Sequence, residues 1–275
     1  MAIRIFFKNF FKWLAFSVDT RIYPSLRALP VKLTLSFMIL LIGISAMIIG
    51  VKIAVIVREK IIEMGRIYET HFPPAKLVDG MLILENDEPI IYKGTDYQIV
   101  MDVTGNEYQR EAEFPIALIF LRDRMIIDTE SSGTKEYKYS ILGQTDMTVT
   151  SQTIDSTKGI TSIIAFFFWT GLLLINWSVQ TALMTLIGSF IVGIVAAFSR
   201  ILLPRNEQLK IALTAAVPVI ILTVIEHLFL IIDNVGLYAG PLPGALLAFN
   251  IAVFTAFVVF GTRGYLKPFI PKDNL

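Results

Sequence analysis

The chain has 275 residues, of which 55% are hydrophobic, and its mean hydropathy is +0.66. Soluble globular proteins are usually less apolar, so these values indicate a membrane protein. The net charge is +1, and the basic residues outside the acidic stretch 58–158 form only short patches beside apolar runs, which argues against nucleic-acid binding. The absence of cysteine excludes disulfides, thiol catalysis and cysteine-ligated metal sites.

Residues 1–30 form a basic, aromatic segment, and its apolar part, residues 3–16, is too short and too charged to cross a bilayer. Aromatic residues alternate with lysines, a pattern typical of a helix that lies on the membrane surface with its lysines snorkelling to water. Alternatively, Phe6, Phe10 and Trp13 pack against the membrane helices. The two interpretations are compatible.

Residues 31–57 are expected to form the first transmembrane helix, since their only charges are Lys32 at the start and Lys52 near the far end. The helix should continue into water over residues 58–72, where apolar side chains keep a helical period. Pro73 and Pro74 should then end it, because a proline disfavours helix at the residue before it.

Residues 58–158 are predicted to form an acidic, β-rich domain outside the cytoplasm. They hold 18 of the 23 acidic residues and 11 of the 24 basic ones. Lys93-Gly94-Thr95-Asp96 has the composition of a hairpin turn between two alternating runs. Residues 143–158 read as a linker or a short amphipathic connector. The expected strands are 81–85, 89–93, 97–103, 116–121, 125–128 and 136–141.

Residues 159–262 are predicted to form a transmembrane helical bundle, followed by a basic tail at 263–275. Residues 160–198 carry no charge, and one helix of that length would be about twice as long as the bilayer core is thick. A break at the polar cluster 176–180 is therefore expected. The predicted fold class is a polytopic α-helical membrane protein with about five hydrophobic segments: 31–57, 160–177, 179–200, 211–232 and 244–261.

Basic residues before the first helix place the N-terminus in the cytoplasm and residues 58–158 outside it. With five crossings, however, the later basic patches around Arg200 and Arg263 would lie outside, against the same rule. If residues 160–198 cross only once, both patches lie inside. Segment length favours five crossings, whereas charge favours four.

Three ionisable residues stand in or beside the fourth apolar segment: Glu226, His227 and Asp233. Charges at such depth are costly unless they are paired or wetted, and they are often functional, for example in ion coupling or proton relay. The other interpretation is a structural hydrogen bond or a partner contact near the headgroups. Pro218 should kink this segment.

Small residues recur every four positions at Thr185, Ser189, Gly193 and Ala197, a pattern that lets membrane helices approach closely. This helix-packing seam could contact another helix of the chain or another protein. No catalytic motif is present, and the chain has only two histidines, so we expect neither an enzyme nor a cofactor or metal site.

Several short motifs carry a resemblance to a known family. They are Leu77-Val78-Asp79-Gly80-Met81-Leu82, Glu88-Pro89-Ile90-Ile91, Met101-Asp102-Val103-Thr104-Gly105, Leu121-Arg122-Asp123-Arg124-Met125, the Tyr-x-Tyr-Ser of 137–140 and Ala215-Ala216-Val217-Pro218. In this order they resemble a bacterial membrane family catalogued as a domain of unknown function, number eleven-eighty-nine, which includes YvdJ-like maltodextrin-utilisation proteins. The helical part also resembles the Yip1-type membrane fold.

The resemblance implies a non-enzymatic protein of the bacterial cytoplasmic membrane. We therefore expect an accessory or scaffold subunit that binds another membrane complex, with an ABC-type sugar (maltodextrin) transporter as the partner that the relatives suggest. The alternative is a small transporter or channel that uses Glu226, His227 and Asp233.

Overall fold

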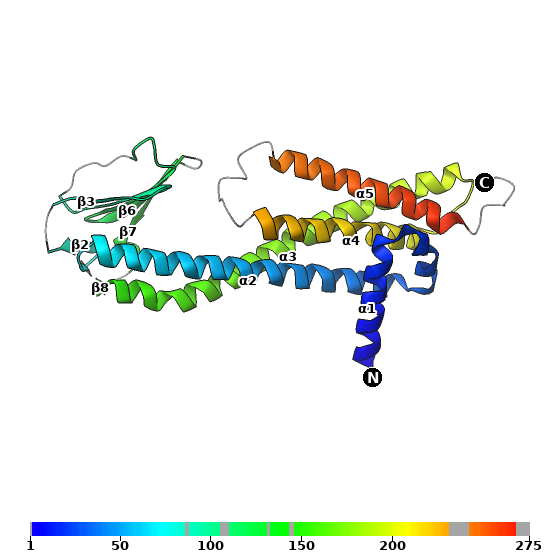
Figure 1. Ribbon diagram of the computed structural model, residues 1–275, viewed down its shortest axis with the longest axis horizontal. Helices are drawn as coiled ribbons and strands as arrows, with labels where there is room; N and C mark the ends of the chain where they lie inside the picture. The colour runs from blue at the N-terminus through cyan, green and yellow to red at the C-terminus, as the bar shows by residue number, and fades with distance from the viewer. Residues whose placement is uncertain are drawn as a thin grey trace. The chain divides into compact units, whose positions relative to one another are not determined.

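The computed structural model describes residues 2–85, 88–104, 110–130, 133–142, 146–230 and 242–267. The chain divides into two compact units, a helical unit (Met1–Ile53 with Ala165–Leu275) and a β unit (Ala54–Ile164). Helices α2 (Val31–His71) and α3 (Ser151–Phe198) run through both. The other helices are α1 (Ala2–Val18), the 3₁₀ helix η1 (Thr20–Ala28), α4 (Arg205–Leu230) and α5 (Leu242–Leu266) (Figure 1).

Four of the described helices, α2, α3, α4 and α5, are long and apolar enough to cross a membrane. The strands of the β unit all lie between α2 and α3 in the sequence. The prediction of a helical membrane protein with an inserted β domain is therefore confirmed. The expected helical extension of the first span is also confirmed, since α2 ends at His71, one residue before Phe72-Pro73.

The expected number of hydrophobic segments, about five, is corrected to four among the described residues, because α3 is a single helix of 48 residues. The predicted break at 176–180 is absent. That cluster contains neither glycine nor proline, so nothing in it prevents helical backbone. Trp177 is buried in the helical core, while Asn176, Ser178 and Gln180 are exposed.

Helix α1 packs on the helical unit through one face, which includes Trp13 and Phe10. The Trp13 ring lies 5.6 Å from the Phe37 ring of α2, and its indole N–H donates to the Thr214 hydroxyl of α4 over 3.2 Å. Phe7 and Phe11 remain exposed on the opposite face. The structure thus shows the predicted packing of α1 residues against the membrane-length helices. The exposed aromatic face of α1 is still suited to a membrane surface.

Helix α4 is the centre of the helical unit, because every residue from 210 to 220 is buried. It lies beside α5 and contacts α1 and η1 (Figure 1). The helix continues through Pro218, where the sequence predicted a kink. Small side chains such as Ala212, Ala215 and Ala216 let its neighbours approach closely on several sides.

A buried polar network joins η1, α4 and α5. The Lys210 ammonium lies 2.8 Å from the Glu207 carboxylate and donates to the Leu26 carbonyl over 3.2 Å. The Tyr265 hydroxyl donates to the same carboxylate. Arg27 donates to the Tyr265 carbonyl over 2.7 Å, and its guanidinium lies over the Tyr265 ring. The network satisfies charges that would otherwise be costly to bury.

The β unit contains two sheets. A three-stranded sheet has the order β2-β1-β8, and a five-stranded sheet has the order β3-β4-β5-β6-β7. All pairs are antiparallel except β4 with β5. The strands are β1 (Ala75–Val78), β2 (Met81–Leu84), β3 (Ile90–Lys93), β4 (Tyr97–Asp102), β5 (Ile116–Leu121), β6 (Arg124–Thr129), β7 (Gly133–Lys138) and β8 (Met147–Val149); η2 spans Tyr139–Leu142.

The predicted hairpin at 93–96 is confirmed, since β3 and β4 pair antiparallel and the Gly94 N–H donates to the Tyr97 carbonyl. Strands β1 and β8 were not predicted. They pair with each other, and the expected linker at 143–158 therefore contains a strand and the first turns of α3. A second hairpin joins β1 and β2 through Asp79 and Gly80, which both have positive φ. Asp-Gly suits such a two-residue turn.

Candidate functional site

Two of the three ionisable residues singled out in the apolar segments lie in the last described turns of α4. The Glu226 carboxylate accepts a hydrogen bond of 3.2 Å from the side-chain amide of Asn250 on α5. The amide oxygen of Asn250 is buried and has no hydrogen-bond partner among the described residues. Asp233, the third residue, lies outside the described residues. The structure therefore adds Asn250 to this group. In the sequence, Asn250 is a polar residue within the apolar segment 244–261.

His227 is held within the bundle. Its Nδ1 lies 2.7 Å from the Thr223 carbonyl, one turn earlier on α4. Its ring meets the Trp177 ring of α3 edge to face, at 5.7 Å between centroids. Trp177 lies in the cluster 176–180 where a helix break was expected, but it is a packing partner of His227 instead.

Lys52 of α2 completes this polar layer. Its ammonium donates to the Leu228 carbonyl of α4, next to His227 in the sequence. A cation at the end of a helix compensates the unpaired carbonyls and the negative end of the helix dipole. Lys52 was visible in the sequence as the single charge between residues 33 and 57, but its partner lies 176 residues away. We define Lys52, Trp177, Glu226, His227 and Asn250 as the polar layer.

The polar layer holds a carboxylate, an imidazole and an ammonium at one level of α4. Each group is hydrogen-bonded or packed within the helical unit. Among the described residues, no group of three or more histidine, aspartate or glutamate side chains could hold a metal ion. Through these contacts, residues of α2, α3 and α5 meet near the end of α4.

The buried row of α3 differs from the predicted seam. Thr185 is buried, Ser189 and Gly193 are half-buried, and Ala197 is exposed. A spacing of four drifts by about 40° per step around a helix with 3.6 residues per turn, so the row leaves the contact face. The buried residues follow steps of four with one step of three instead: Thr181, Thr185, Gly188, Val192 and Ala196.

Within this buried row, Gly188 is the position where α4 and α5 come very close to the α3 backbone. A Cβ atom added there would lie 2.7 Å from the Phe254 ring of α5 and 3.1 Å from the Ala212 Cβ of α4. A Cβ at Gly193 would make only ordinary contacts, at 3.5 Å from Gln208. The small residues of α3 therefore serve packing inside the helical unit at Gly188.

The β unit contains a cavity of about 540 Å³. Its walls come from both sheets, from α2 and from the start of α3, and they include Met64, Leu82, Met101 and Ile154. The lining is almost entirely apolar. This volume is within the range of about 300–1,000 Å³ that is usual for small-molecule sites. No sequence pattern pointed to it, because its walls are ordinary apolar strand residues.

The exposed side of the cavity is formed by Tyr137, Lys138, Ile141 and Met147. Tyr139, behind them, is buried, and its hydroxyl has no hydrogen-bond partner among the described residues. Burial, and secondarily the charge of Asp123, raises the pKa of Tyr139, so the hydroxyl stays protonated and able to donate.

Fold and sites together define a helical membrane protein that carries a β unit between its first two membrane-length helices. The chain belongs to the family described as Protein of unknown function (DUF1189), whose model matches residues 7–262. The family resemblance seen in the motifs is therefore confirmed. Comparisons with curated proteins and with solved structures gave no match.

Proposed function

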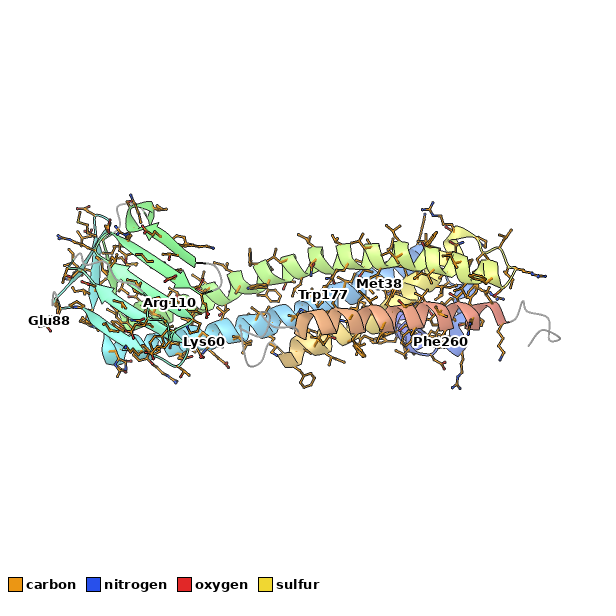
Figure 2. All side chains as sticks on the ribbon, turned by 90° about the horizontal axis from the view of Figure 1, so that it is seen from above. Met38, Lys60, Glu88, Arg110, Trp177 and Phe260 are labelled. Carbon is orange, nitrogen blue, oxygen red and sulfur yellow. The ribbon has the colours of Figure 1, made fainter. Side chains whose placement is uncertain are left out.

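We propose that this protein is a non-enzymatic accessory or scaffold subunit that binds another membrane protein through the apolar face of α3. The observation that carries the proposal is the length of that face. Within the helical unit, large apolar side chains of α3 are exposed from Phe167 to Phe198, and side chains stand out along this part of the helix (Figure 2).

A stretch of that length measures about 47 Å at 1.5 Å per residue, whereas a bilayer core is about 30 Å thick. Even a tilt of about 40°, at the upper end of what membrane helices show, leaves about 36 Å along the bilayer normal. Lipid chains therefore leave part of the face uncovered. A helix of a partner protein would bury the remainder, because exposed apolar patches of this size usually mark interaction sites.

The partner that the family resemblance suggests is an ABC-type importer of sugars such as maltodextrins. Photo-crosslinking in cells tests the interface. A benzoylphenylalanine at Phe168 or Phe190, both exposed on α3, is expected to give a discrete protein adduct. Matched controls at Phe249 and Phe260, exposed on α5, should give lipid adducts.

Mass spectrometry of the adduct then identifies the partner. An importer subunit would support the full proposal, and a different membrane protein would retain the scaffold role while rejecting the importer. Lipid adducts alone at both α3 positions would contradict the interface.

The protein is further proposed to lie in the bacterial cytoplasmic membrane with its N-terminus in the cytoplasm and residues 58–158 outside. Four crossings support this orientation, because the basic residues before α2, around Arg205 and around Arg263 then share one side. The charge rule and the helix count agree only when α3 crosses once.

Single thiols test this orientation without background mutations, since the chain has no cysteine. In intact cells, an impermeant maleimide should label Lys135→Cys on β7, whereas Asn206→Cys at the start of α4 should react only after the cells are opened. Both residues are exposed. Labelling of Asn206→Cys in intact cells would instead require a fifth crossing.

The alternative of a small transporter draws on one observation, the buried amide oxygen of Asn250 beside Glu226. Against it, the other polar groups of the layer have partners within the helical unit, and α4 is wholly buried from 210 to 220. Proton or substrate flux into reconstituted vesicles that Glu226→Gln abolishes would favour transport.

A further inference from the structure

The cavity of the β unit is too large and too apolar to be filled well by water. Its volume of about 540 Å³ is far larger than the roughly 30 Å³ that one water occupies in the liquid, and a bound water needs two to four polar partners. The almost wholly apolar lining offers few. The cost of leaving such a cavity empty rises with its volume, so an apolar occupant would stabilise the unit.

The walls suit a flexible occupant. Four methionines line the cavity: Met64 on α2, Met101 on β4, Met125 on β6 and Met147 on β8. Methionine side chains are unbranched and adapt their shape to what they contact. One apolar side chain of a docked peptide would fill only part of this volume, whereas a long hydrocarbon chain would fill it.

The cavity also lies close to the apolar ends of two membrane-length helices. Along α2, Met64 lies seven residues beyond residue 57, where the apolar run ends, a distance of about 10 Å. Along α3, Ile154 lies four residues before Lys158, after which the uncharged run begins, a distance of about 6 Å. A lipid chain therefore has a short route from the bilayer to this site.

One cationic residue stands among the lining residues, Lys138, and it is exposed at the end of β7. It forms no ion pair with any residue that the structure describes. Next to it in the sequence, the buried Tyr139 hydroxyl has no acceptor within the part of the chain that the structure describes. A negatively charged headgroup would pair with the Lys138 ammonium, and one of its oxygens could give the Tyr139 hydroxyl a partner.

We propose that the cavity of the β unit binds the acyl chain of an anionic single-chain amphiphile, with the headgroup at Lys138. A free fatty acid and a lysophospholipid share this chemistry and are the two possible sources. The site does not depend on the α3 interface, so either proposal can fail without the other.

The test uses the full chain in nanodiscs of phosphatidylcholine and a palmitic acid that carries a photoreactive diazirine in its chain. After irradiation, adducts are located by peptide mass spectrometry. We expect adducts on peptides that contain Met101, Met125 and Met147. Membrane helices will also react, and they serve as the internal reference for the amount of probe present.

Two neighbouring residues of β2 give a matched pair of variants. Leu82 is buried and lines the cavity, whereas Ile83 points to the other face of the strand and is half exposed. Leu82→Trp places a bulky ring in the space of the acyl chain and should lower the adduct yield on the cavity peptides at least about fivefold, relative to the membrane helices. Ile83→Trp should leave it unchanged. Equal yields in both variants would overturn the proposal.

A second pair tests the headgroup on the surface, where folding is not at risk. Lys138→Glu should weaken competition by unlabelled palmitate about tenfold, while the same change at Lys135, which does not line the cavity, should have no effect. Methyl palmitate, without the charge, should compete equally against all three proteins. Equal effects of the two substitutions would reject Lys138 as the headgroup partner.

Further competitors identify the source. Displacement by palmitate indicates a fatty acid, and displacement by lysophosphatidylglycerol alone indicates a lysophospholipid. Displacement only by an apolar hexapeptide would overturn the amphiphile in favour of a peptide ligand. Absence of adducts on the cavity peptides of the wild-type protein would reject the site altogether.

Discussion

Replacing Lys210 by methionine is expected to lower the free energy of unfolding of the helical unit by about 3 kcal/mol. Removing one partner of a buried ion pair typically costs about 3–5 kcal/mol, because the other charge stays buried without compensation. The Lys210 side chain is 4% exposed, but Glu207 is 25% exposed, so the lower end of the range applies. The Leu26 carbonyl also loses its donor.

The matched control is Lys60→Met. Lys60 forms an ion pair with Glu63 at 2.7 Å, with the same spacing of three residues, but both side chains are well exposed. Exposed pairs contribute about 0–1 kcal/mol, so this variant should unfold nearly as the wild type does. Unfolding is followed by denaturant titration in mixed micelles. Similar losses for both lysines would show that the pair in the helical unit is solvated. The double variant Lys210→Met with Glu207→Gln should recover part of the loss.

Truncating Trp13 to alanine should cost about 3–5 kcal/mol, the usual range for a fully buried aromatic residue. The side chain is 0% exposed, packs against Phe10 and Phe37, and donates to Thr214. Its removal leaves a cavity between α1, α2 and α4, and the Thr214 hydroxyl loses a donor while it keeps its own hydrogen bond to the Lys210 carbonyl. The same micelle titration measures the loss.

The comparison for Trp13→Ala is Phe11→Ala on the same helix. Phe11 is 62% exposed, so its truncation should change the free energy of unfolding by less than about 1 kcal/mol. If α1 only rested on the membrane surface, the two variants would behave alike. A clear difference would establish that α1 is part of the helical core.

The helix ends and the hairpins show how far local sequence carries the fold. The end of α2 at His71 follows from two prolines, and the turn at 93–96 follows from its composition. Strands β1 and β8, in contrast, are short and pair across more than 60 residues. Their strand conformation depends on that pairing, which no local pattern encodes.

Among the candidate site residues, Glu226 and His227 could be found because charges in an apolar run are rare. Their partners Asn250 and Trp177 could not be assigned, since each lies on another helix. The buried face of α3 also differs from the predicted helix-packing seam, with which it shares Thr185. A spacing of four is visible in the sequence, but the contact face is set by where α4 and α5 lie.

The sequence by itself determined that this is a helical membrane protein with an acidic β unit after its first span. Composition suffices for that, because lipid accepts only long uncharged helices and charged residues need water. Tertiary structure alone decided that α3 is one helix, that Lys52 closes the end of α4, and that apolar strand residues enclose a cavity. These features depend on contacts between segments that are distant in the sequence. The same local pattern of apolar residues is compatible with many different pairings of these helices and strands.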